Sequence, residues 1–134
     1  MNAVLVDSNV LLDVFTKDAR WSAWSAGALA AASDARRLVV NAVIYAEVSV
    51  RFSRVEELDD ALPRADFARE ALPYPAAFLA AKAHQAYRRR GGTRAATLPD
   101  FFIGAHAAVA GHDLLTRDPR RFRAHFPTVA LITP

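Results

Sequence analysis

Short, continuously apolar segments recur along the chain, and most of them lie next to a segment with helical patterning. The apolar segments cover residues 3–7, 37–41, 113–116 and 129–133. A strand that is apolar on both sides has to be covered on both faces, which is typical of parallel strands separated by helices. The pattern therefore predicts an α/β fold, a three-layer α/β/α arrangement with a mostly parallel central sheet flanked by helices.

The helical patterning predicts a series of helices between and after these strands, with Ser8 or Asn9 able to cap the first and Asn41 the third. The expected helices cover residues 8–15, 19–37, 42–53, 75–90, 98–111 and 119–126. Residues 54–72 predict a helix broken near Pro63, followed by a second helix or a short strand. Since no repeat, linker or low-complexity tract interrupts the pattern, we expect one domain over residues 1–134.

Composition narrows the class of protein. With 134 residues, 53% of them hydrophobic, the chain is large enough to bury a sizeable core. The absence of cysteine excludes disulfides, thiolate nucleophiles and cysteine-based zinc sites. The apolar amino-terminal stretch is short and contains Asp7 and Asp13, and the apolar run 101–111 is too short to span a bilayer. We therefore expect a cytoplasmic protein that does not enter membranes.

Acidic residues fall where a parallel sheet places its ligand site. Asp7 ends the first apolar segment and Asp118 follows the third one, so both belong at the carboxyl edge of the sheet. Glu47 and Asp100 lie in otherwise apolar helical segments. Carboxylates that converge repel one another unless a divalent cation joins them, and oxygen ligands suit Mg²⁺ or Mn²⁺. Three neutral side chains are placed to support such a site: Ser8, Asn9 and Thr116.

Each acid, taken alone, also fits an ordinary structural role. Asp7 is able to accept hydrogen bonds in a strand-to-helix turn, and Glu47 is able to face solvent on an amphipathic helix. Asp100 stands three residues after Thr97, the spacing of a capping box, and Asp118 precedes a proline as an N-cap would. It is the four positions together that favour a shared metal site.

Four segments of the chain resemble the PIN-domain family, and more narrowly the VapC-type toxins of bacterial toxin–antitoxin pairs. The segments are VLVDSNVLLDVF, NAVIYAEV, LPDFFIGAHAAVAGHDLLTRD and FRAHFPTVALITP. The resemblance covers nearly the whole chain with order and spacing intact, and it implies a PIN-like fold. It matches Asp7, Glu47, Asp100 and Asp118 to the family's four acids, which act as catalytic and metal-binding residues, and Asn9 and Thr116 to its supporting polar positions.

The resemblance also implies an activity and partners. The expected activity is a metal-dependent endoribonuclease that cleaves single-stranded or looped RNA with metal-activated water, using Mg²⁺ or Mn²⁺ as cofactor. The expected partners are a cognate VapB-like antitoxin, which inhibits the enzyme, and a second copy of the chain in a homodimer. The RNA sequence that is cleaved, the number of metal ions and the identity of the antitoxin are not readable from the residues.

The cations fit an RNA substrate. The formal net charge is +3, and all cationic side chains except Lys17 and Lys82 are arginines, which bind phosphates in bidentate fashion. A solvated basic face explains the same pattern equally well. The arginines that we expect to bind RNA cluster near Asp100 and Asp118: Arg88, Arg89, Arg90, Arg94, Arg117, Arg120 and Arg121.

Other functions fit less well. A metal-free ribonuclease would need an acid/base pair such as His106 and His112, but His106 lies in an apolar helical run where a buried structural histidine is commoner. His84 and His125 are expected at the surface. A haloacid-dehalogenase-like phosphohydrolase would need an acid at position 9, which is Asn9, and the acids and lysine of a receiver domain are missing. The remaining alternative is a catalytically silent PIN scaffold that binds RNA or a protein partner.

Overall fold

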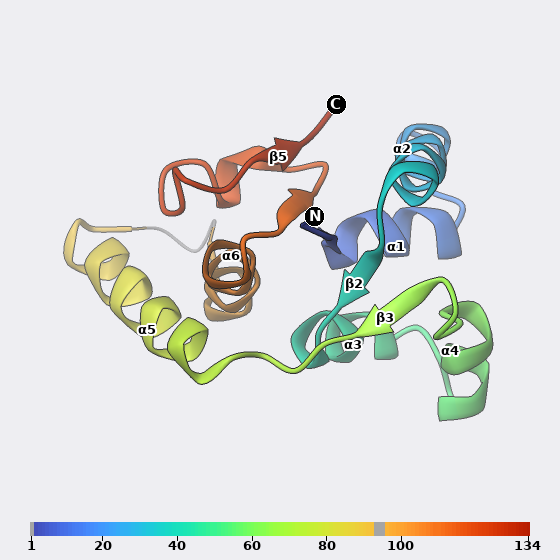
Figure 1. The fold of residues 1–134 in the computed structure, drawn as a ribbon, viewed down its shortest axis with the longest axis horizontal. Coiled ribbons are helices and arrows are strands. Elements are labelled where there is room, and N and C mark those ends of the chain that lie inside the picture. The colour runs from blue at the N-terminus through green and yellow to red at the C-terminus, as the bar shows by residue number, and fades with distance from the viewer. Residues whose placement is uncertain (1, 93–95) are drawn as a thin grey trace.

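A parallel β-sheet forms the centre of the molecule (Figure 1). The computed structural model describes residues 2–92 and 96–134, and within these residues the sheet has five strands in the order β3-β2-β1-β4-β5. Every neighbouring pair is parallel. The strands are β1 (Val4–Val6), β2 (Leu38–Val40), β3 (Phe67–Arg69), β4 (Asp113–Leu115) and β5 (Leu131–Ile132).

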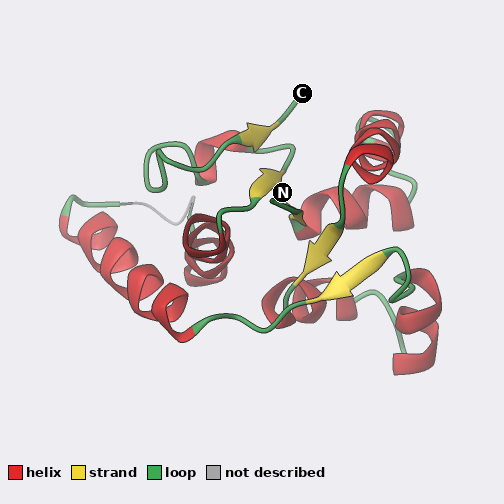
Figure 2. Ribbon diagram, in the orientation of Figure 1, coloured by secondary structure: helices red, strands yellow, loops and turns green. Residues whose placement is uncertain are grey.

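Helices separate the strands, as the sequence pattern predicts (Figure 2). They are α1 (Ser8–Phe15), α2 (Ser22–Ala35), α3 (Ala42–Ser49), α4 (Val55–Ala61), α5 (Tyr74–Arg89) and α6 (Leu98–Ala110), with a 3₁₀ turn, η1, over Pro119–Arg121. Figure 1 shows α5 and α6 on one side of the strands and α1, α2 and α4 on the other. The predicted α/β/α architecture is therefore confirmed.

Three local expectations are settled by the structure. The open choice in residues 54–72 is settled as one helix, α4, followed by a strand, β3. Asn41 caps α3, because its Oδ1 accepts a hydrogen bond from the backbone N–H of Ile44 at 2.9 Å. The expectation that Ser8 or Asn9 caps the first helix is wrong. Asp7 occupies the N-cap position, and Ser8 and Asn9 are the first two residues of α1 itself.

Two apolar clusters form the core. The larger one surrounds the sheet and includes Leu5, Val39 and Leu114, all fully buried. The smaller one lies between α5 and α6, where Ala76, Ala80, Ala105, Phe101 and Phe126 pack together. Because the strands are short and buried, the residues that follow them directly are held in fixed positions at the carboxyl edge of the sheet.

Membrane insertion finds no support in the helices. Among the described residues, none belongs to a helix that is long and apolar enough to cross a bilayer.

Gly104 allows α6 to approach the ring of Phe126 closely. A Cβ at position 104 would stand 2.3 Å from Phe126 Cδ2, and this ring is only 4% exposed, so it has little room to move. We expect Gly104→Ala to lower the free energy of unfolding by about 1–3 kcal/mol, since the clash outweighs the better helix propensity of alanine. Urea denaturation measures this change.

Gly27 provides the matched control, because it lies in α2 and a Cβ there would meet no atom within 4 Å. We expect Gly27→Ala to raise the free energy of unfolding by up to about 1 kcal/mol. Equal effects of the two substitutions would contradict this account of α6.

Candidate active site

Asp7 is the most buried acid at the carboxyl edge of the sheet. It follows β1 directly, its side chain is almost inaccessible, and its Oδ2 accepts a hydrogen bond of 2.8 Å from the hydroxyl of Thr116. Thr116 follows β4, which pairs with β1, so two neighbouring strand ends meet at this contact. The Thr116 hydroxyl also accepts hydrogen bonds from the backbone N–H of Asp118 at 3.1 Å and from Asn9 Nδ2 at 3.4 Å. The three polar groups thus hold the first acid from the side of β4.

Ser8 links the first acid to the second. Its hydroxyl lies 2.8 Å from Glu47 Oε1 and 3.5 Å from Asp7 Oδ1, and so bridges the start of α1 to α3. The alternative that Glu47 simply faces solvent on an amphipathic helix would require an exposed side chain, but Glu47 is half-buried. The two acids therefore share one hydroxyl, although they are 40 positions apart in the sequence.

Asp100 has the structural role and the site position at the same time. Its Oδ2 accepts hydrogen bonds from the backbone N–H of Thr97 at 2.9 Å and from the Thr97 hydroxyl at 3.1 Å, which closes a capping box at the start of α6. Its Oδ1 faces Arg121 Nη1 at 3.5 Å. The capping box therefore fixes the carboxylate and leaves one oxygen directed at other groups.

Asp118 lies between two arginines. Arg120 Nε is 3.1 Å from its Oδ1, and Arg121 Nε is 3.2 Å from its Oδ2. Asp118 makes no side-chain cap for η1, so the simple N-cap alternative is not what the structure has. Because Arg121 also contacts Asp100, one guanidinium joins the third and fourth acids.

The electrostatics separate Asp7 from the other acids. Burial raises the pKa of Asp7 to about 7; the Thr116 hydrogen bond is the next largest influence and lowers it, and the charges of Asp100 and Glu47 raise it further. Burial also raises the pKa of Glu47, with a further contribution from Asp100. Burial works to raise the pKa of Asp118 as well, but the hydrogen bond from Arg120 and the charges of both arginines outweigh it, and the pKa is lowered. The three acids Asp7, Glu47 and Asp100 therefore interact electrostatically, and the charge of Arg121, which lowers the pKa of Asp7 and of Glu47, compensates part of this effect.

This cluster suits a hard divalent cation. All available donors are carboxylate or hydroxyl oxygens, which Mg²⁺ and Mn²⁺ prefer, and a bound cation would offset the repulsion from Asp100 and Glu47 that adds to the effect of burial on the pKa of Asp7. No three of these carboxylates have oxygens within 4.8 Å of one another among the described residues. An ion that keeps several waters would take some of the carboxylates directly and reach the others through water.

A different group of side chains does meet that spacing. Glu70, His106 and His112 bring ligand atoms within 4.8 Å of one another, with His106 Nε2 at 2.8 Å and His112 Nε2 at 2.7 Å from Glu70 Oε1. The proton positions follow from Asn41. Its Oδ1 is used in capping α3, so its Nδ2 donates to His106 Nδ1 at 3.0 Å, and the proton of His106 is therefore on Nε2.

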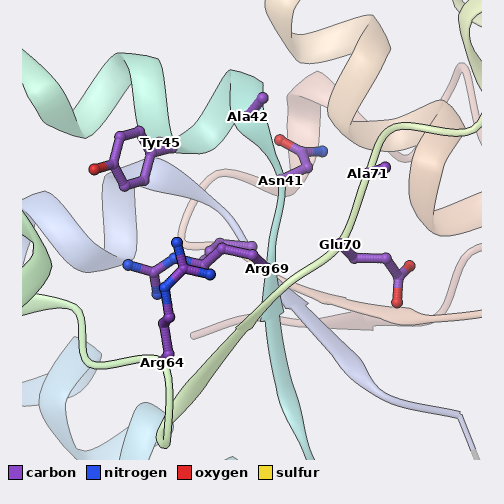
Figure 3. A pocket seen from close by; sticks show the side chains of 8 residues that line it. Asn41, Ala42, Tyr45, Arg64, Arg69, Glu70 and Ala71 are labelled. Carbon is purple, nitrogen blue, oxygen red and sulfur yellow. The ribbon is translucent and has the colours of Figure 1, made fainter.

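Glu70 accordingly accepts a hydrogen bond from His106, and the 2.7 Å contact makes it the acceptor for His112 as well. Burial works to raise the pKa of Glu70, but the hydrogen bonds from His112 and His106 outweigh it and hold that pKa below its usual value. Figure 3 shows Glu70 pointing away from Arg64 and Arg69, on the rim of a cavity of about 310 Å³. The group is a buried hydrogen-bond network that ties α6 to the end of β3, and the sequence analysis missed Glu70 and His112 as members of it.

The comparisons with known proteins identify the family and the fold. A family model described as PIN domain matches residues 4–126, which is most of the chain. The chain belongs to the PIN domain family. A comparison with curated proteins finds no match.

Solved structures share the same PIN fold. The chain is similar to VapBC2 from Rickettsia felis bound to a DNA fragment from the promoter, with 12% identity, a TM-score of 0.75 and 98% of each chain covered. It is similar to VapBC-1 from nontypeable Haemophilus influenzae, with 15% identity, a TM-score of 0.74 and coverage of 98% of this chain and 97% of that one. A toxin–antitoxin complex from Klebsiella pneumoniae has 22% identity, a TM-score of 0.73 and 98% of each chain covered.

The arginines of the PIN domain that we expected to bind RNA fall into different environments. Arg88, Arg89 and Arg90 are exposed at the end of α5, whereas Arg94 lies outside the described residues. Arg120 is largely exposed beside Asp118, and Arg121 bridges two acids.

Arg117 forms an ion pair that we did not predict from the sequence. Its Nε lies 2.7 Å from Oδ2 of the buried Asp13, which also accepts a hydrogen bond of 2.8 Å from Ser25, and its guanidinium stacks over Trp21. The ion pair joins α1 to the segment after β4. The only sequence signal for this ion pair was that Asp13 is an acid in the middle of an apolar helix.

The raised pKa of Asp7 predicts how stability depends on pH in EDTA. The unfolded chain releases this proton near 3.8 and the folded chain near 7, so stability is fully present below the first value and falls as the pH rises through the second. We expect a loss on the order of 4 kcal/mol between pH 4 and pH 8 from this group alone. Asp7→Asn should remove most of this slope, and thermal denaturation across that range measures it. Parallel curves for the two proteins would contradict the assignment.

Proposed function

We propose that this protein is a VapC-type endoribonuclease toxin that cleaves single-stranded or looped RNA. The observation that carries the proposal is the coupled cluster of Asp7, Glu47 and Asp100 at the carboxyl edge of the sheet of a PIN domain. Asp100 also closes the capping box of α6, but that role does not require Asp7 and Glu47 beside it, and burying like charges together destabilises the fold. A divalent cation bound among the three carboxylates would offset this cost.

Mg²⁺ or Mn²⁺ is the proposed cofactor, held by Asp7, Glu47 and Asp100, with Asp118 as the fourth acid. When bound, the ion would lower the pKa of a water molecule and offset negative charge on the phosphodiester. The protein's own polar groups orient the carboxylates. Thr116 and Asn9 orient Asp7, Ser8 orients Glu47, and the capping box orients Asp100. Because water attacks, the products would carry a 5′-phosphate and a 3′-hydroxyl.

The arginines around Asp118 supply the phosphate contacts. Arg120 and Arg121 are paired with acids. Cation binding by Asp100 and Asp118 would compete for the same carboxylate oxygens and so release the two guanidiniums toward the RNA backbone. Arg88, Arg89, Arg90 and Arg94 are proposed to extend this surface, whereas Arg117 would act through its ion pair with Asp13.

The structurally similar complexes support the proposal that this chain has a protein partner. Those complexes pair a toxin with an antitoxin, and by similarity of fold we propose a VapB-like antitoxin that inhibits this chain. We also propose a homodimer, a cytoplasmic location where the RNA substrates are, and a single domain over residues 1–134.

Asp7→Asn and Asp100→Asn test the nuclease. With Mn²⁺ and a mixture of cellular RNA, we expect wild-type protein to cleave and each variant to lose activity by about 100-fold or more, because each loses a ligand worth several kcal/mol in the transition state. The matched control is Asp34→Asn, an exposed acid of α2, which should cleave like wild type. End-group analysis of the fragments checks the predicted termini.

Metal binding has a readout that does not depend on cleavage. At pH 8, Mn²⁺ should raise the melting temperature of wild-type protein and of Asp34→Asn, but much less that of Asp7→Asn. If RNA is bound but left intact by wild-type protein with Mn²⁺, the chain is a silent PIN scaffold.

A further inference from the structure

A cavity of about 340 Å³ opens beside the fourth acid. This volume is within the range of pockets that hold small organic ligands. The described residues that line it come from the end of α5, the segment before α6 and the segment after β4: Tyr87, Ala96, Asp118, Arg120, Arg121 and His125. The lining therefore combines charged groups next to the proposed catalytic cluster with two aromatic rings.

The two rings are held in place from behind. The centroids of Tyr87 and His125 are 4.9 Å apart in an edge-to-face arrangement, and both rings contact Phe101, at 5.5 Å and 4.8 Å. Phe101 is almost fully buried in the cluster between α5 and α6. His125 is partly exposed at the surface, and the contacts with Tyr87 and Phe101 give the cavity an ordered aromatic lining.

His125 is suited to stacking rather than to ion pairing. Burial, followed by the charge of Arg90, lowers the pKa of its imidazole, which favours the neutral ring. A neutral imidazole does not repel the guanidiniums of Arg120 and Arg121. Among the described residues, the charged groups that line the cavity with His125 and Tyr87 are these two arginines and Asp118.

Flat aromatic walls next to guanidiniums match the two halves of a nucleotide. Unpaired bases of RNA stack on tyrosine and histidine rings, whereas arginines bind the adjoining phosphates. Asp118 and Arg121 both line this cavity, and Arg121 contacts Asp118 as well as Asp100. The cavity therefore adjoins the acidic cluster. A base placed here would belong to a nucleotide close to the phosphodiester that the cluster attacks.

We propose that the cavity between Tyr87, His125 and Arg121 binds one unstacked nucleobase of the RNA substrate, adjoining the scissile phosphodiester. The inference rests on the proposed ribonuclease function and adds a reason for single-strand preference. A base inside a duplex is stacked on its neighbours and cannot enter a walled cavity, so the pocket selects loops and single strands.

Tyr87→Leu and His125→Leu remove the rings while keeping an apolar side chain of moderate size. RNA binding is measured by fluorescence anisotropy in the Asp7→Asn background with Mn²⁺, so that cleavage does not interfere. We expect each ring substitution to weaken binding of a short single-stranded RNA by about 5- to 100-fold. Tyr87→Phe keeps the ring and should restore most of the affinity.

Tyr74→Leu is the matched control, since Tyr74 lies on the same helix and is 92% exposed, far along α5 from Tyr87. It should bind RNA like its parent. Melting temperatures of all variants are measured in parallel, because the Tyr87 ring also packs on Phe101.

RNAs with one abasic nucleotide at successive positions identify the base that enters. At one position the abasic RNA should bind the parent weakly, and Tyr87→Leu should then cause little further loss, since the contact is already missing. Additive losses at every position, or equal binding by Tyr87→Leu and Tyr74→Leu, would overturn the inference. The proposed function fails separately, if wild-type protein with Mn²⁺ cleaves no RNA, whatever the binding data show.

Discussion

The hydrogen bond between Thr116 and Asp7 is the contact on which the site depends. It joins the ends of two neighbouring parallel strands, and it holds a carboxylate that the fold has almost entirely removed from water. A lone buried carboxylate would simply keep its proton. Here the same acid also feels Glu47 and Asp100, so its ionisation is linked to two helices as well as to two strands.

Asp100 and Arg121 show how the same groups serve folding and the site together. The capping box directs one oxygen of Asp100 to the start of α6, while the other oxygen remains available to a cation. Arg121 contacts that oxygen and spans two of the four acids. Its charge limits the repulsion between the acids that the folded chain must tolerate.

The sequence predicted the layers, and the position of two acids relative to the sheet, for a physical reason. Strands covered on both faces are continuously apolar, and parallel strands collect the residues that follow them at one edge, so Asp7 and Asp118 were placed correctly relative to the sheet. The meeting of Ser8 with Glu47 across α1 and α3 followed from no local pattern, because it depends on how two helices pack. β3 stayed ambiguous because its residues are only half-buried and its sequence, Phe-Ala-Arg, lacks the β-branched character of the inner strands.

Long-range polar contacts were the least predictable part. His106 was expected to be a structural histidine, and it is one, but its partners Asn41 and Glu70 lie 65 and 36 positions away in the sequence. The ion pair of Arg117 with Asp13 joins residues 104 positions apart. An arginine in a basic stretch looks the same in sequence whether it faces solvent or a buried acid, and only the three-dimensional packing distinguishes Arg117 from Arg120.

The bond between Asn41 and His106 has a mechanical consequence. Asn41 begins the helix that carries Glu47, and His106 belongs to the helix that carries Asp100, so the two helices are fastened together through the interior beneath the acids. The separation of these two carboxylates is then set by a buried amide and an imidazole, not by the connecting loops. A change in the outer helix α4 would then leave the spacing of Glu47 and Asp100 unaltered, whereas a change at the end of β3 would disturb it, because Glu70 accepts a hydrogen bond from the same imidazole.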